Sequence, residues 1–225
     1  MRNDAIEEIV SSVRAESPAP ETLDRIRKTL VAGIAPVRPL PSDRTLIAIV
    51  FACVVLFSIA ATVPFGFLAA QSLTAYQTFL LYPTLAACAS FCASAVVGQM
   101  IPGSSRNRQP SVPILCSLIL LMAVTLTIFR DFGLTGFVDR GVPCLRLGTA
   151  MAVIAFCLIC GFLRKGLVTS WLRAGALGGG LAGLTGVSVL ALHCPIQNAP
   201  HVLVWHLGVI VAAGLGGLLF GWIRD

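Results

Sequence analysis

The sequence predicts an all-α fold: a polytopic membrane protein with a six-transmembrane-helix bundle and a short cytoplasmic helical N-terminal tail. Composition is the first reason, since 56% of the residues are hydrophobic and 12% are charged, about half the charged share of a soluble domain. The mean hydropathy of +0.89 agrees with this. Six long apolar runs, and an uneven distribution of basic residues around them, are the second and third reasons.

The first 44 residues form a polar tail with seven basic and seven acidic side chains, which we treat as a domain separate from residues 45–225. Residues 3–16 are predicted to be an amphipathic helix, because apolar residues recur there at the spacing of one helical face. These apolar residues are Ile6, Ile9, Val10 and Val13. Pro18 and Pro20 are expected to end this helix.

A second short helix is expected over residues 21–32, followed by an extended, proline-rich linker at residues 36–41. Helices this short are marginal in water on their own. Two interpretations of the tail therefore stay open. Either it is partly disordered or lies on the membrane surface, or it folds against a cytoplasmic partner and presents its apolar face to a groove.

The apolar runs predict six membrane spans, most of them near the roughly 20 residues that a helix needs to cross the bilayer. They extend over residues 45–66, 76–101, 113–129, 145–163, 171–192 and 201–222. The third run is short, and a bilayer can thin locally around such a helix. The fifth and sixth runs carry Gly or Ala at every fourth position, a spacing that lets helix backbones approach closely.

The basic residues predict the orientation, because loops on the cytoplasmic side are enriched in Lys and Arg. One side of the spans is flanked by Arg38, Arg44, Arg106, Arg108, Arg164, Lys165, Arg173 and Arg224. The other side is flanked by Arg130, Arg140 and Arg146, and two of these charges are offset by Asp131 and Asp139. Both termini are therefore expected in the cytoplasm, with the loops at 67–75, 130–143 and 193–200 outside.

Eight cysteines are present, and six of them lie within predicted spans, where we interpret them as small apolar packing residues. These six are Cys53, Cys88, Cys92, Cys116, Cys157 and Cys160. Cys144 opens the fourth span and Cys194 closes the fifth. A short loop joins these spans, so they should be antiparallel neighbours with the two cysteines at one membrane height. We hypothesise a disulfide or redox pair, with two free thiols as the alternative.

All three histidines fall within residues 193–206, together with Cys194. Thiols and imidazoles suit zinc or copper, so a metal or haem site is the competing interpretation. His201 and His206 are five residues apart, about 140° around an ideal helix, and would reach one ion only if the helix began after His201. His201 and Trp205 are expected to share a face instead. On this spacing we predict no bound metal and no cofactor.

His206 lies inside the sixth span, where an ionisable side chain is a candidate functional group, although an imidazole hydrogen-bonded across helices is an equal alternative. Arg146 lies just inside the fourth span and is expected to snorkel to the interface or to pair with Asp139 or Asp131. We group the candidate residues of this outer edge as His193, His201, Trp205, His206 and Arg146.

The sequence contains no phosphate-binding loop, catalytic triad or pair of carboxylates within the spans, so no enzymatic activity is expected. The apolar runs carry no acidic residue at all, which argues against a pump that relays protons through carboxylates. The same shortage of polar residues in the spans disfavours a transporter of small solutes.

Three segments together resemble the NrsF family: Pro143-Cys144-Leu145-Arg146-Leu147-Gly148, Ala191-Leu192-His193-Cys194-Pro195 and His201-Val202-Leu203-Val204-Trp205-His206-Leu207-Gly208. The tail, with its short leading helix and Pro-Val-Arg-Pro-Leu-Pro linker, is similar to this family too. Its members are six-span proteins of the bacterial inner membrane that act as anti-sigma factors for extracytoplasmic-function (ECF) sigma factors.

The resemblance implies that the cytoplasmic tail binds an ECF sigma factor and keeps it from RNA polymerase without contacting nucleic acid. The apolar face of the tail, formed by Ile6, Ile9, Val10 and Val13, is the surface that we expect to bind it. It also implies that Cys144 and Cys194 match the family's cysteine pair, which is implicated in sensing oxidative or metal stress. The alternative from a different class is a membrane redox or haem/metal-binding protein that uses His193, His201, His206 and the two cysteines. A visible absorption band or stoichiometric metal in the purified protein would favour that alternative.

Overall fold

The computed structural model describes residues 19–32, 41–101 and 111–225. The predicted helix over residues 3–16, with its apolar face of Ile6, Ile9, Val10 and Val13, lies outside the described residues, as does most of the proline-rich linker. The chain divides into two units, Met1–Leu40 and Pro41–Asp225, and each is described by itself.

In the first unit, the described part is helix α2 (Pro20–Ala32), which agrees with the second helix expected from the sequence. Pro20 is the first residue of α2, whereas the end of the preceding predicted helix lies outside the described residues. Proline is favoured at the first helical position because its fixed φ fits the helix and its missing N–H has no partner there in any case. The apolar side chains of Leu23, Ile26 and Leu30 are all exposed.

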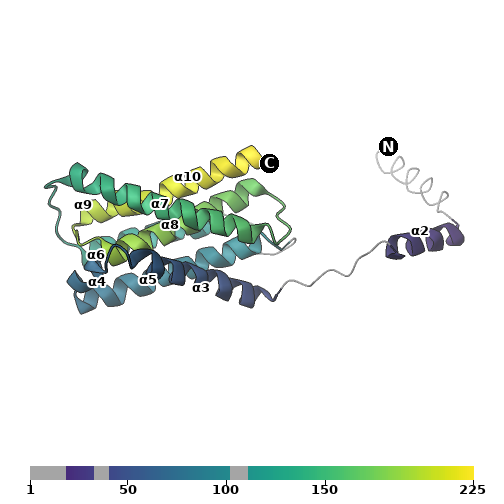
Figure 1. Cartoon of the computed structure of the whole chain (residues 1–225), viewed down its shortest axis with the longest axis horizontal. Coiled ribbons are helices and arrows are strands. Elements are labelled where there is room, and N and C mark those ends of the chain that lie inside the picture. Colours follow the sequence, from purple (N-terminus) through teal and green to yellow (C-terminus); the bar gives the residue numbers. More distant parts are fainter. Residues whose placement is uncertain (1–18, 33–40, 102–110) are drawn as a thin grey trace, which may run out of the picture. The chain divides into compact units, whose positions relative to one another are not determined.

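The second unit is a bundle of helices, and its described residues contain no strand. Figure 1 shows these helices running roughly alongside one another, with α4 and α9 at one end of the bundle and the end of α10 at the other. The helices are α3 (Asp43–Thr62), α4 (Leu68–Ser72), α5 (Ala75–Gly98), α6 (Ser111–Ile128), α7 (Phe137–Leu163), α8 (Trp171–His193), α9 (Ala199–His201), the π-helical turn η2 (Val202–His206) and α10 (Leu207–Arg224).

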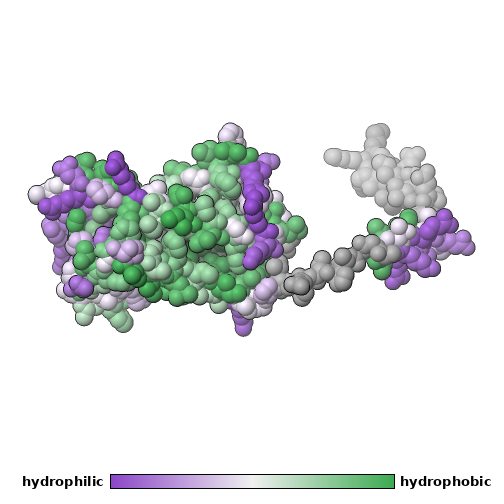
Figure 2. All heavy atoms as spheres, in the orientation of Figure 1, coloured by the Kyte–Doolittle hydropathy of each residue, from purple (hydrophilic) through white to green (hydrophobic). Residues whose placement is uncertain are grey.

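Five helices in the described residues are long and apolar enough to cross a membrane: α3, α5, α7, α8 and the continuous stretch Ala199–Arg224. The prediction of a helical membrane protein is therefore confirmed, while the predicted third span corresponds to α6, an apolar helix below that length. Figure 2 shows hydrophilic residues gathered at the two ends of this unit and a hydrophobic band between them. This is the distribution expected of a surface that faces lipid.

Two helices begin earlier than the apolar runs predict. Helix α7 begins at Phe137, eight residues before the predicted span, so much of the expected loop 130–143 is helical and Cys144 lies within the helix. Because Asp139 and Arg140 in the first turn of α7 are charged, the apolar run does not extend over this turn, and the prediction from hydropathy began the helix too late. The last apolar stretch begins at Ala199, where the Asn198 side chain accepts a hydrogen bond from the His201 N–H at 3.1 Å and caps the helix.

Helix α8 is the centre of the bundle. In its most apolar stretch 83% of the residues are buried, against 22–50% in the other four long helices. It packs against α10, α7, α5 and α3, so most of the bundle is assembled on it. A helix that is apolar on every side can be buried on every side.

The seam between α8 and α10 depends on residues without side chains. A Cβ added at Gly175 would collide with the carbonyl oxygen of Gly217, and a Cβ added at Gly217 would collide with the carbonyl oxygen of Gly175. At Gly183 an added Cβ would lie 2.6 Å from the Cα of Ile210. The predicted close approach of small residues at every fourth position is thus confirmed.

The far ends of α8 and α10 are tied together by the Asp225 carboxylate. Its two oxygens accept hydrogen bonds from the backbone N–H groups of Leu172, at 2.9 Å, and Trp171, at 2.8 Å, at the start of α8. These N–H groups have no partner within the helix, and their hydrogen bonds hold the pKa of the Asp225 carboxyl below its usual value. The Arg224 guanidinium stacks over the Trp171 ring at 4.1 Å.

Replacing Gly217 by Ala should destabilise the bundle, because the new methyl group meets the backbone of α8; overpacking of this kind costs about 1–3 kcal/mol. Gly216→Ala is the matched control, since no described atom lies within 4 Å of a Cβ at that position. Thermal unfolding in detergent, followed by circular dichroism, should give a lower midpoint for Gly217→Ala and an unchanged or higher one for Gly216→Ala. Equal midpoints would contradict the described seam.

Candidate functional site

Four side chains with thiol or imidazole groups meet at the end of the bundle that holds α4 and α9. They are Cys144, Cys194, His201 and His206, and one potential ligand atom from each lies within 4.8 Å of all the others. The Sγ atoms of Cys144 and Cys194 are 3.4 Å apart, and the Cys194 Sγ lies 3.5 Å from Nε2 of His201. The rings of His201 and His206 meet edge to face, with centroids 5.2 Å apart. We call these four residues the thiol–imidazole cluster.

The two cysteines are free thiols, and their sulfur separation is longer than the roughly 2.0 Å of a disulfide bond. Cys144 comes from the second turn of α7, and Cys194 follows the last residue of α8. The connectivity argument from the sequence expected these two residues to be neighbours at one membrane height, and the structure brings them together. Whether they form a disulfide or a redox pair stays a prediction.

The π-helical turn η2 brings the two histidines onto one face. The Leu207 N–H donates to the carbonyl oxygen of Val202, five residues back, where an α-helix would use the residue four back. The wider turn takes up the extra residue between His201 and His206. The sequence-based expectation that these residues lie about 140° apart is wrong, because it assumed an ideal α-helix throughout. The pairing of His201 with Trp205 on one face is replaced by the pairing of His201 with His206.

Burial of the cluster is almost complete. Cys194, His201 and His206 are 4%, 1% and 3% exposed, while Cys144 is half-buried and is the member that solvent or lipid reaches most readily. The Nε2 of His206 is buried and has no hydrogen-bond partner among the described residues. A cavity of about 30 Å³ lies beside Cys194 and His206.

The residues around the cluster hold its segment in place. The Ala199 N–H donates to the carbonyl oxygen of Asp131 at 2.8 Å, which ties the start of α9 to the connection between α6 and α7. The Asn198 cap fixes the first turn, and the Gln197 amide donates to the Ser72 hydroxyl at 2.6 Å. Sequence reasoning missed these positioning residues, although Asn198 followed closely by Pro200 is a recognisable start of a helix.

Trp205 supports the π-helical turn from the side of α7. Its ring lies 5.3 Å from the Phe137 ring and fills the space over Gly141, where an added Cβ would collide with the indole. Trp205 is therefore a neighbour of the cluster rather than a member of it. Its function in the structure is to hold η2 against the first turns of α7.

Two predicted residues of the outer edge lie apart from the cluster. His193 donates from Nδ1 to the Gly66 carbonyl oxygen at 3.1 Å, and its ring contacts that of Phe65 in a tilted arrangement, so it fastens the end of α8 to the turn between α3 and α4. Arg146 is exposed on α7. The alternative interpretation placed His193 with the other histidines, whereas the structure separates it from them.

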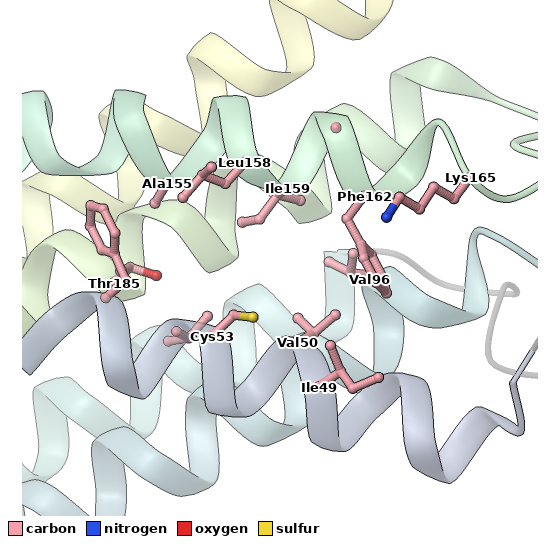
Figure 3. Close-up of a pocket in the computed structure, with 13 residues that line it drawn as sticks. Ile49, Val50, Cys53, Val96, Ala155, Leu158, Ile159, Phe162, Lys165 and Thr185 are labelled. Carbon is pink, nitrogen blue, oxygen red and sulfur yellow. The ribbon is translucent and has the colours of Figure 1, made fainter.

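An apolar groove of about 320 Å³ lies elsewhere on the bundle, between α3 and α7, and was not predicted from the sequence. Figure 3 shows its lining, which includes Cys53 and Val50 from α3 facing Leu158 and Ile159 from α7, with Lys165 at one end. None of the predicted site residues lines it. Its walls are apolar and carry no constellation for chemistry, so the thiol–imidazole cluster is the stronger functional candidate.

Apolar helices of membrane-spanning length, with a group of two thiols and two imidazoles at one end of the bundle, define a helical membrane protein. The sequence profile of the NrsF family, described as negative regulator of sigma F, matches residues 30–224, and the chain belongs to this family. Its function is accordingly regulatory: negative control of a sigma factor, which is its partner. No curated protein and no solved structure matches the chain significantly.

The sulfur separation of 3.4 Å predicts that Cys144 and Cys194 join readily under a mild disulfide-forming oxidant. Alkylation without reductant, followed by mass spectrometry, should then find neither thiol labelled and a cross-linked peptide pair. Because Cys194 and some of the other cysteines are buried, the alkylation is carried out on denatured protein, where the other six cysteines are labelled as internal controls and Cys144→Ser should leave Cys194 labelled. Full labelling of both thiols after oxidation would contradict the described geometry.

Proposed function

We propose that this protein is an anti-sigma factor for an ECF sigma factor, which it holds at the bacterial inner membrane and releases when the thiol–imidazole cluster changes state. The family membership carries the first half of this proposal, since the family consists of negative regulators of a sigma factor. The cluster supports the second half, because it is the place in the described residues where reactive side chains gather.

In this proposal the sigma factor binds the tail, residues 1–44. The face formed by Ile6, Ile9, Val10 and Val13 enters an apolar groove of the sigma factor as an amphipathic helix. The family profile begins at residue 30, so this face precedes the matched segment. The apolar side chains of Leu23 and Ile26 on α2 are exposed and support a tail that offers apolar surface to a partner.

The proposed topology has six spans, both termini in the cytoplasm and the cluster on the outer, periplasmic side. The basic residues support it, since Arg164, Lys165, Arg173 and Arg224 all lie at the end of the bundle opposite to the cluster. The periplasm is oxidising, so a thiol pair there is exposed to the chemistry that it would report. The tail and the cluster then lie on opposite sides of the bilayer.

The proposed signal is a change in the bonding of Cys144 and Cys194 under oxidative or metal stress. The two residues belong to α7 and to the end of α8, so a shorter or longer sulfur separation shifts α7 against α8. That shift biases the tail between binding and release of the sigma factor. The alternative, a membrane redox or haem protein, predicts a visible absorption band in the purified protein.

Ile9→Asp should release the sigma factor and leave membrane insertion intact, because a carboxylate on the apolar face cannot enter an apolar groove without losing its hydration. Ser11→Asp adds the same charge on the opposite face of the predicted helix and is the control. Co-purification of the sigma factor with the membrane fraction measures the effect. We expect more than about tenfold loss for Ile9→Asp, a difference of about 1.4 kcal/mol, and retention for Ser11→Asp. Retention in both variants would count against the tail as the binding segment.

Cys144→Ser and Cys194→Ser should each abolish the release of the sigma factor by a disulfide-forming oxidant, because a single thiol leaves no partner for the bond. The Cys157→Ser control should respond as the native chain does, since Cys157 lies outside the cluster. The measurement is the amount of sigma factor freed from membranes before and after oxidant. Equal release from Cys144→Ser and the native protein would place the sensor elsewhere.

A further inference from the structure

The thiol–imidazole cluster has the ligand set and the spacing of a four-coordinate metal site. Two thiolates and two imidazoles with Zn–S bonds of about 2.3 Å and Zn–N bonds of about 2.0 Å place neighbouring ligand atoms about 3.3–3.8 Å apart in a tetrahedron. Of the six distances between the four ligand atoms, that between Cys144 and Cys194 is 3.4 Å and that between Cys194 and His201 is 3.5 Å. All four ligand atoms lie within 4.8 Å of one another, so small side-chain movements complete the tetrahedron.

The state of His206 points independently to a missing ligand. The side chain is 3% exposed, and its Nε2 has no hydrogen-bond partner among the described residues. Buried polar atoms are nearly always paired, because leaving one unpaired sacrifices its hydration without replacement. A metal ion bound by this imidazole supplies the absent partner.

The backbone around the cluster is already arranged to present both histidines. Asn198 caps the turn that carries His201, and the π-helical turn, signalled by the bond from the Leu207 N–H to the Val202 carbonyl oxygen, rotates His206 toward it. Single π-helical turns inside α-helices occur frequently at functional sites. Trp205 holds this turn against α7, the helix that carries Cys144. The ligands therefore come from three segments that the fold already holds together.

We propose that Cys144, Cys194, His201 and His206 bind one Zn²⁺ ion. The charge of the resulting centre favours a divalent ion, because two thiolates and two neutral imidazoles neutralise Zn²⁺ completely, whereas Cu⁺ would leave a net negative charge in a buried, apolar site. Four protein ligands leave no open position for a substrate, so the centre is structural or regulatory rather than catalytic. The half-buried Cys144 gives the ion its route of access.

Zinc binding and disulfide formation exclude each other, because both use the same two sulfur atoms. A hydroperoxide is the oxidant that converts the zinc-bound state into the disulfide. The two thiolates lose two electrons and form the S–S bond, and Zn²⁺ leaves. The O–O bond of the hydroperoxide breaks, takes up these two electrons and two protons from the solvent, and gives an alcohol and water. This consequence rests on the proposed sensing function, whereas the binding of zinc does not.

The test uses the full-length chain in detergent, reduced and stripped by a chelator, and then titrated with Zn²⁺ and, separately, with Co²⁺ as a spectroscopic substitute. We expect one equivalent of Zn²⁺ and, with Co²⁺, a thiolate-to-metal charge-transfer band with the intense visible bands of tetrahedral coordination. His206→Ala and Cys144→Ser should each weaken binding more than about tenfold, as loss of a ligand requires. Cys157→Ser should bind as the native chain does, since Cys157 lies outside the cluster.

His206→Cys keeps a ligand at the position, so it should retain one equivalent and increase the charge-transfer intensity. This variant separates loss of a ligand from loss of the fold. The proposal is overturned if the native chain binds no Zn²⁺, or if His206→Ala and Cys144→Ser bind it as tightly as the native chain. Either result says nothing about sigma-factor binding, because the titration contains no sigma factor. Conversely, a failure of the tail to bind the sigma factor would leave the metal titration unchanged.

Discussion

The close contact between α8 and α10 is the constraint on which the rest of the bundle depends. Lipid tails are as apolar as the helix surfaces, so helices in a membrane associate through close packing rather than through the hydrophobic effect. Gly175 and Gly217 allow backbone to touch backbone along this seam. The seam also sets the height of His206 relative to Cys194, because the two residues lie at adjoining ends of these helices. The position of the cluster thus depends on glycines that lie about three to five turns away along the two helices.

Much of the fold could be predicted from the sequence, because membrane spans are marked by composition and length. Hydropathy found the six apolar helices, and the spacing of small residues found the α8–α10 contact. Hydropathy placed the start of α7 too late, because it marks the part of a helix that lies in the hydrocarbon layer and not where the helix itself begins. Asp139 and Arg140 continue α7 beyond the apolar stretch, and Gly136 in the left-handed region, with φ at 64°, begins it.

The site was predictable only in part. Connectivity was enough to bring Cys144 beside Cys194, because a short loop makes consecutive helices antiparallel neighbours. The position of His206 beside His201 could not be predicted from connectivity, because the π-helical turn is accompanied by tertiary contacts of Trp205 with Phe137 and Gly141. No local periodicity in the sequence reveals such a turn. An ideal helical wheel therefore separated two histidines that the folded chain places together.

The groove between α3 and α7 gives the two flanks of α7 different stiffness. On one flank α7 meets α8, where Gly148 lies against Gly186 and neither side has slack. On the other flank the groove of about 320 Å³ is lined by apolar side chains such as Leu158, Ile159 and Phe162. Helix α7 is thus closely packed on the flank that meets α8 and loosely packed beside the groove, while Trp205 of η2 lies against its first turns. Space for side chains to rearrange therefore lies on the groove side of α7, and the backbone contact with α8 leaves none on the other.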